Sequence, residues 1–169
     1  MKQQNGFTLM ELMVVVAITA ILAAVAVPNI VAYRSNQRLG ASARAILSAI
    51  KETRMRAINE QANTVITFDI ANDKYLAFVD DGAGSVDGDL DGVLDGAGNG
   101  VQDGTEETII SGNLPGDIDM NNAAFGFLGA ENRFDLLGRA SANGNVTLTN
   151  SRGLIQRVTV LLSGNARIT

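Results

Sequence analysis

The chain has 169 residues, a formal net charge of −5, and neither cysteine nor histidine. This length is enough for one domain with an appendage. The missing residue types exclude disulfides, thiolate nucleophiles, Cys/His metal sites and catalysis by imidazole. The sequence also lacks a nucleophile elbow, a phosphate loop and a dinucleotide fingerprint, so we expect a protein that is not an enzyme.

The N-terminal segment departs from the composition of a soluble domain. Residues 12–27 read LMVVVAITAILAAVAV, in which Thr19 has the only polar side chain. A helix over residues 7–27 would be about 31 Å long, close to the ~30 Å hydrocarbon core of a bilayer. Because this helix is apolar on nearly every face, residues 7–28 are predicted to cross a membrane once. Lys2 precedes the apolar run, which favours a cytoplasmic N-terminus and a C-terminal part on the far side.

Glu11 is the one residue at odds with a membrane segment. An ionised carboxylate near hydrocarbon is costly unless it is paired, and the sequence offers no cation within one helical turn of it. Cleavage between Gly6 and Phe7 would create an α-amino group on Phe7 and make Glu11 the fifth residue of the mature chain. The carboxylate of one subunit would then pair with the amine of a staggered neighbour. This predicts that the two charges are neutralised only in an assembly.

The run Gly6-Phe7-Thr8-Leu9-Met10-Glu11-Leu12, followed by an apolar helix and Pro28, resembles the N-terminal signature of type IV pilins and of type II secretion pseudopilins. The resemblance implies that prepilin peptidase removes residues 1–6 as a leader and that Phe7 is then N-methylated. It also implies that Glu11 guides assembly with other pilins and that Pro28 breaks the helix. The implied location is the bacterial inner membrane, with a periplasmic C-terminal domain that later joins a periplasmic pseudopilus.

Two other interpretations of this segment remain open. It would serve as a secretory signal cut after Ala26, because Ala24-Val25-Ala26 is an acceptable small-x-small cleavage site, or as an uncleaved anchor. The three hypotheses predict mature chains that begin at N-methylated Phe7, at Val27 and at Met1.

Residues 29–62 are predicted to continue the helix outside the membrane as a stalk, since they are rich in helix formers. Leu39, Ala43, Ile46 and Ile50 follow spacings of 4, 3 and 4, which places them on one face that needs a partner surface. Basic side chains occupy the opposite side: Arg34, Arg38, Arg44, Lys51, Arg54 and Arg56. They are interpreted as a solvated helix face or as contacts to lipid headgroups or acidic neighbours.

The remaining part of the chain is predicted to form strands. Residues 65–70 and 75–79 read as a hairpin with a turn at Asn72-Asp73, and further strands are expected at 145–149, 157–162 and 166–169. A helix followed only by strands, with no strand–helix alternation, favours an antiparallel arrangement. The expected fold class is α+β: a long N-terminal helix, transmembrane at its start, packed on a C-terminal antiparallel β-sheet domain over residues 63–169.

Within the pilin-like family, the second half of the chain resembles the GspH/FimT branch. The similar segments are Leu39–Ala57 leading into a strand pair, Phe134 through Gly138-Arg139, and Val158-Thr159-Val160 to Ser163-Gly164. The resemblance implies a minor pseudopilin of type II secretion, at or near the pseudopilus tip. The alternative it implies is a FimT-like minor pilin that serves type IV pilus assembly or DNA uptake. In some FimT relatives C-terminal arginines contact DNA, but only Arg167 stands in that stretch here, so nucleic acid is not an expected partner.

Residues 80–119 form an acidic, glycine-rich insertion. They hold nine Asp and two Glu with no Lys or Arg, a charge of −11 that leaves +6 on the rest of the chain. Such a composition predicts a long loop. A register that starts at Asp87 partly follows the spacing of a calcium loop, but Gly98 stands at its twelfth position, where the last ligand should be. A second register starts at Asp95 and has Ala97 at its third position, where a ligand is also expected. The alternatives are a Ca²⁺ site and a solvated acidic loop. The candidate ligands are Asp87, Asp89, Asp91, Asp95, Asp103 and Glu106.

Overall fold

The computed structural model describes residues 7–80, 100, 102 and 106–169. Within these residues the chain forms one long helix and then only strands, apart from the short 3₁₀ helix η1 (Gly126–Leu128). The helix is α1 (Leu9–Glu60), and the first four strands are β1 (Asn63–Asp69), β2 (Lys74–Asp80), β3 (Thr108–Asn113) and β4 (Ile118–Phe125). The others are β5 (Glu131–Phe134), β6 (Gly144–Asn150), β7 (Ile155–Val160) and β8 (Ala166–Ile168). The expected α+β class is confirmed.

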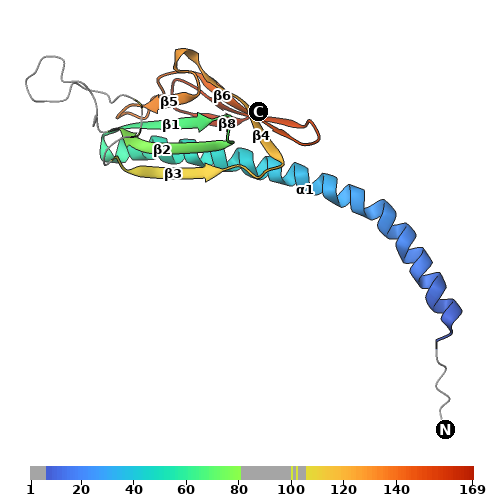
Figure 1. Ribbon diagram of the computed structural model, residues 1–169. Coiled ribbons are helices and arrows are strands. Elements are labelled where there is room, and N and C mark those ends of the chain that lie inside the picture. The colour runs from blue at the N-terminus through green and yellow to red at the C-terminus, as the bar shows by residue number, and fades with distance from the viewer. Residues whose placement is uncertain (1–6, 81–99, 101, 103–105) are drawn as a thin grey trace, which may run out of the picture.

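The helix is a single element of 52 residues that includes both the predicted membrane segment and the predicted stalk. The expectation that Pro28 breaks it is wrong, because the helix continues through this residue. Proline lacks only its own N–H, so one backbone bond is lost while those on either side hold the helix together. Figure 1 shows a gradual curve in the N-terminal half, with the domain on the C-terminal half.

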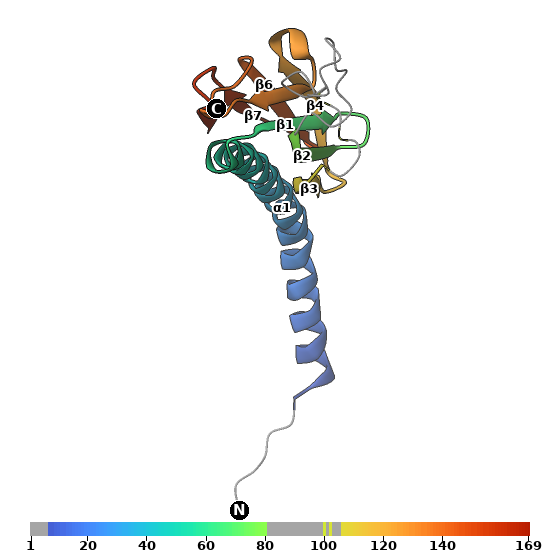
Figure 2. The same ribbon diagram turned by 90° about the vertical axis from the view of Figure 1, so that its left-hand side faces the viewer.

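The strands form two four-stranded antiparallel sheets, where the sequence led us to expect one. The first sheet has the order β3-β2-β1-β5 and the second the order β4-β6-β7-β8. Both sheets lie along the C-terminal half of α1, and the N-terminal half projects away from them (Figure 2). The Phe68 and Phe125 rings stack at a centroid distance of 5.6 Å and join the first sheet to the second.

The predicted apolar stripe of the stalk is the centre of the core. Leu39, Ala43, Ile46 and Ile50 are all fully buried. They belong to one apolar cluster with Ile66 and Phe134 of the first sheet and with Val146, Leu148 and Val158 of the second. Burial of each large side chain contributes roughly 1.5–3 kcal/mol, which fixes the stalk to both sheets.

Three of the six stalk bases contact the β domain, so the interpretation as a solvated face holds only for part of the set. Arg38 forms an ion pair with Asp117 and Arg56 forms one with Glu107. Arg54 donates from Nε to the Gly138 carbonyl at 2.9 Å. Their long side chains reach around the helix, whereas Arg34, Arg44 and Lys51 lie on the exposed surface.

Two polar contacts fix the ends of the domain against the helix. Near the exposed N-terminal half of α1, Asn150 Nδ2 donates to Asn36 Oδ1 at 2.9 Å. At the other end, the Arg54 guanidinium also donates to Asn165 Oδ1 at 2.9 Å. Gly164 makes this second contact fit, because it has φ +76° and a Cβ there would lie 1.9 Å from the Gly138 carbonyl oxygen.

The predicted hairpin is confirmed, with β1 paired to β2 and Asp69 opposite Lys74. The Asp69 carboxylate closes the turn by accepting bonds from the Ala71 and Asn72 amides at 3.1 Å. The predicted loop over residues 80–119 is wrong in its last part, where β3 and the start of β4 form. Ile109 and Ile110 pack against the core there, which offsets the polar composition around them.

Candidate functional site

The exposed N-terminal half of α1 is the most unusual surface of the molecule. Every large apolar side chain from Leu9 to Val31 is at least half exposed. The helix is long and apolar enough to cross a membrane, with a mean hydropathy of 2.6 over its most apolar 18 residues. A surface of this kind is stable only in lipid or against other apolar helices.

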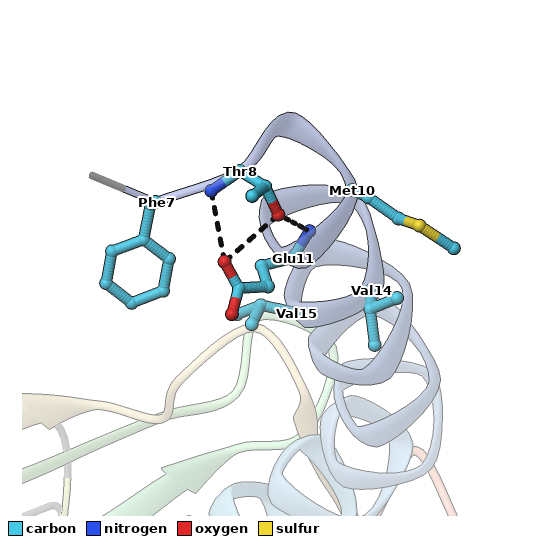
Figure 3. Close-up of a pocket in the computed structure, with 6 residues that line it drawn as sticks. All are labelled: Phe7, Thr8, Met10, Glu11, Val14 and Val15. Atoms are coloured by element: carbon cyan, nitrogen blue, oxygen red, sulfur yellow. Dashed lines mark hydrogen bonds between the residues drawn. The ribbon is translucent and has the colours of Figure 1, made fainter. Parts of the chain in front are cut away.

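Thr8 and Glu11 begin this helix with a reciprocal cap. The Thr8 amide and hydroxyl both donate to Glu11 Oε2 at 3.0 Å, and the Glu11 amide donates back to Thr8 Oγ1 at 3.3 Å. This is a capping box, which satisfies two of the backbone N–H groups that a helix start leaves without partners. Figure 3 shows the Glu11 carboxylate folded back toward Thr8, on the side of the helix where the Phe7 ring lies.

The cap changes the expected environment of Glu11. The sequence suggested a carboxylate with no partner in its own chain, but the structure supplies one from Thr8 three residues earlier. Both Thr8 bonds end on Oε2, so Oε1 is left for a further donor. Cleavage after Gly6 would leave Thr8 and its N–H intact, so the mature chain keeps the same cap.

The Phe7 side chain is 84% exposed and lines an open hollow with Thr8, Glu11 and Val15. The two predicted assembly residues, Phe7 and Glu11, therefore lie together at one end of the helix. A second chain packed alongside would meet an aromatic ring, an apolar surface and a carboxylate in the same place.

Thr19, the only polar side chain in the middle of the apolar run, carries no unmet hydrogen-bonding need. Its hydroxyl reaches the Val15 and Val16 carbonyls at 2.9 and 3.0 Å. Serine and threonine hydroxyls commonly bond the preceding turn in this way, which makes them acceptable in lipid.

The remaining predicted site residues do not join this end of the helix. Gly6 lies outside the described residues, as do Asp87, Asp89, Asp91, Asp95 and Asp103 of the predicted calcium set. Glu106 is described and is 7% exposed, next to the first sheet. In the described ranges no group of three or more Asp or Glu residues is arranged to hold a metal ion.

Sequence reasoning missed the role of Thr8. The signal was present, because Thr-x-x-Glu before an apolar run is the pattern of a capping box. Glu11 has two roles here, as a charge beside the apolar run and as the third residue of the helix, and only the second role involves Thr8.

Comparison with known proteins agrees with this geometry. A prokaryotic N-terminal methylation motif matches residues 1–27. The motif, the exposed apolar helix and the β domain packed on its far half together define a pilin-like protein. The family model of the type II transport protein GspH matches residues 42–164, and the chain belongs to this family.

Solved structures share the fold at low sequence identity. The minor pseudopilin EpsH from the type 2 secretion system of Vibrio cholerae superposes with a TM-score of 0.54 at 11% identity, covering 78% of this chain and 96% of EpsH. The type IV minor pilin FimU of Pseudomonas aeruginosa gives a TM-score of 0.55 at 10% identity, covering 81% of this chain and 92% of FimU. At these identities the likeness shows the fold.

Proposed function

We propose that the chain is a minor pseudopilin of a type II protein secretion system. Prepilin peptidase removes residues 1–6, Phe7 is N-methylated, and the mature chain enters the pseudopilus or stands at its tip. The observation that carries this proposal is the cap at the start of α1, where Glu11 and the future N-terminal residue Phe7 lie together at the end of the exposed apolar half of the helix. Membership of the GspH family supports the secretion system.

Before assembly, α1 anchors the chain in the inner membrane with the β domain in the periplasm. Leader removal on the cytoplasmic side creates an amine at Phe7. In the filament this amine meets the Glu11 carboxylate of a staggered neighbour, through the oxygen that Thr8 does not occupy. Pairing replaces two separate charges in a low-dielectric environment with one neutral contact, so it favours the assembled state over the bilayer state.

A FimT-like minor pilin of a type IV pilus is the second candidate. The similarity of the fold to FimU favours it, since that protein superposes as well as EpsH does. Both candidates need the same cleavage, methylation and helix packing.

Leader cleavage is tested directly by Gly6→Asp, in cells that contain prepilin peptidase. We expect this variant to accumulate uncut in the membrane, because the residue before the cleaved bond must be small enough for the peptidase site. Gln4→Asp is the matched control, with the same charge change two residues upstream, and should be cut normally. Immunoblotting separates the two forms by the leader mass, and processing of Gly6→Asp at the control rate would contradict the proposal.

A further inference from the structure

The apolar part of α1 ends close to the point where the β domain begins. The stretch from Leu12 to Val31 is uncharged, and at 1.5 Å per residue it is about 30 Å long, the thickness of a bilayer's hydrocarbon core. Tyr33 and Arg34 follow directly and are exposed. Tyrosine side chains favour the boundary between lipid and water. Ser35 is already buried by the domain, which therefore starts at this boundary.

The turn between β6 and β7, residues 151–154, is the part of the domain that lies nearest the boundary. Asn150, the last residue of β6, is bonded to Asn36, which follows Val31 by about 7.5 Å of helix. The headgroup layer on each side of a bilayer is about 5–8 Å thick. Figure 1 shows the projecting half of α1 leaving the domain at this end. When α1 crosses a membrane, the turn thus lies at the level of the headgroups.

This turn presents a mixed basic and apolar surface. Arg152 is exposed, and the side chains of Leu154 and Ile155 are 48% and 53% exposed. The backbone of the turn is fixed, because Asn150 Oδ1 accepts bonds from the Arg152 and Leu154 amides at 3.1 and 2.9 Å. A guanidinium group binds phosphate with two parallel N–H bonds, while neighbouring apolar side chains fit between lipid headgroups.

Positive charge prevails at this end of the domain. Within the described part of the chain, neither Arg34 nor Arg152 forms an ion pair. Asn36 faces the turn, and Arg34 points about 200° around the helix axis from it, so the two bases flank α1 on opposite sides. The carboxylate nearest the turn, Asp117, is already neutralised by Arg38 at 3.1 Å. Two other carboxylates lie farther along the β4–β6 ladder: Asp73 and Asp119.

We propose that this end of the domain is a membrane-facing surface that binds the headgroups of anionic phospholipids around α1. The surface consists of Tyr33, Arg34, Arg152, Leu154 and Ile155. Its two unpaired bases match the lipid phosphates in charge, and it is continuous with the apolar segment that crosses the bilayer. The inference rests on the membrane-anchored state of the proposed function and deepens it: before assembly, the β domain is held on the membrane surface at a fixed tilt.

The test measures how close each end of the domain lies to the headgroups. The chain has no cysteine, so Ser151→Cys and Ser163→Cys each provide a single thiol for a bimane label. These exposed serines lie in the turns before and after β7, at opposite ends of the domain, so Ser163→Cys is the matched control. The full-length protein is reconstituted in vesicles of phosphatidylethanolamine and phosphatidylglycerol that contain a headgroup-nitroxide lipid, which quenches bimane at short range. We expect the label at residue 151 to be quenched more strongly than the label at residue 163.

Charge variants test whether the two bases cause this proximity. Arg34→Gln/Arg152→Gln removes both unpaired charges, and Arg44→Gln/Arg157→Gln is the control with the same charge change at exposed arginines farther from the boundary. We expect the first double variant to weaken docking roughly fivefold for each base, which brings the two labels to similar quenching. The control double variant should keep the wild-type difference. High salt and vesicles of zwitterionic phosphatidylcholine should reduce that difference in the wild type.

The outcomes separate this inference from the proposed function. Equal quenching of the two labels in anionic vesicles overturns it, and so does loss of the difference in both double variants. A difference that grows with the protein-to-lipid ratio and ignores lipid charge would make this end a contact between copies of the chain. Carbonate treatment of the same vesicles supplies the distinction: a chain that carbonate extracts has no membrane anchor, which contradicts both proposals, whereas an inserted chain with equal quenching contradicts this inference alone.

Discussion

Substitutions at Glu11 and Thr8 separate the two roles that the structure gives to the start of α1. Glu11→Leu removes both the charge and the cap, Glu11→Gln removes the charge but keeps an acceptor for the Thr8 amide, and Thr8→Val removes only the hydroxyl. If the charge drives assembly, both Glu11 variants should insert in the membrane and fail to enter the filament. Thr8→Val should still enter it.

The expected magnitudes differ enough to be measured. Removing one partner of a charge pair in a low-dielectric environment costs about 3–5 kcal/mol. At about 1.4 kcal/mol for each factor of ten, this lowers incorporation by roughly a hundredfold to several thousandfold. Loss of an N-cap hydroxyl costs about 1 kcal/mol, or roughly fivefold. In Thr8→Val the backbone bond from the Thr8 amide to Glu11 Oε2, 3.0 Å in the structure, remains.

The assay compares two pools of each variant in the same cells: the carbonate-resistant membrane fraction and the sheared filament fraction. The membrane pool is the control for insertion and should be equal in all variants. Filament levels of Glu11→Gln close to those of the wild type would refute the argument from charge pairing. A loss in Thr8→Val as deep as in Glu11→Leu would mean that the cap, rather than the charge, governs assembly.

Two further predictions concern the β domain. Gly164→Ala should lower the free energy of unfolding by about 2 kcal/mol or more, since it adds a clash with the Gly138 carbonyl to the strain of φ +76°, whereas Gly153→Ala, with φ +79° and open space, should cost about 1 kcal/mol. Urea unfolding of both variants measures these losses. An equal loss of unfolding free energy in the two variants would contradict the close packing of Gly164 beside Gly138 and Arg54. The Asn72 side-chain amide and the turn amides hold the pKa of Asp69 below its ordinary value. The ionised, hydrogen-bonded carboxylate therefore stabilises the fold at pH values above the ordinary pKa of 3.8. This stabilisation is lost as the pH falls through the lowered pKa. Asp69→Asn should lack this acid-dependent loss in unfolding curves between about pH 5 and pH 2, and a profile identical to that of the wild type would contradict it.

The elements with strong local patterns were predictable from the sequence. The apolar run and the stripe of Leu39, Ala43, Ile46 and Ile50 have the spacing of a helix, and all four stripe residues are buried as that spacing requires. The β1–β2 hairpin has apolar strands with a turn between them. In these segments the local preference and the final packing agree.

The missed strands depend on contacts far along the chain. β3 follows nine acidic residues of the insertion, so the composition of the segment hid the apolar pair Ile109-Ile110. β5 is four residues long, and its sequence ENRF shows only one apolar side chain, Phe134, which the core holds fully buried. The division into two sheets is likewise set by pairing between distant strands, such as β1 with β5.

The candidate sites divide in the same way. Phe7 and Glu11 lie in one short motif, so the sequence placed them together. By contrast, the polar cavity of about 190 Å³ lined by Asn63, Asp80 and Ser141 has no sequence motif, because its lining comes from three strands and the segment after β5, which only the fold brings together. Chain order alone gives no sign that Asn63 and Ser141 are neighbours.

The most direct test of the account is the mass of the N-terminal peptide of the chain isolated from its native host. Digestion and mass spectrometry should find a first residue of Phe7 carrying one extra methyl group on its amine. A native chain that begins at Met1 or at Val27 would have no amine beside Glu11, and that result would contradict assembly through this pair.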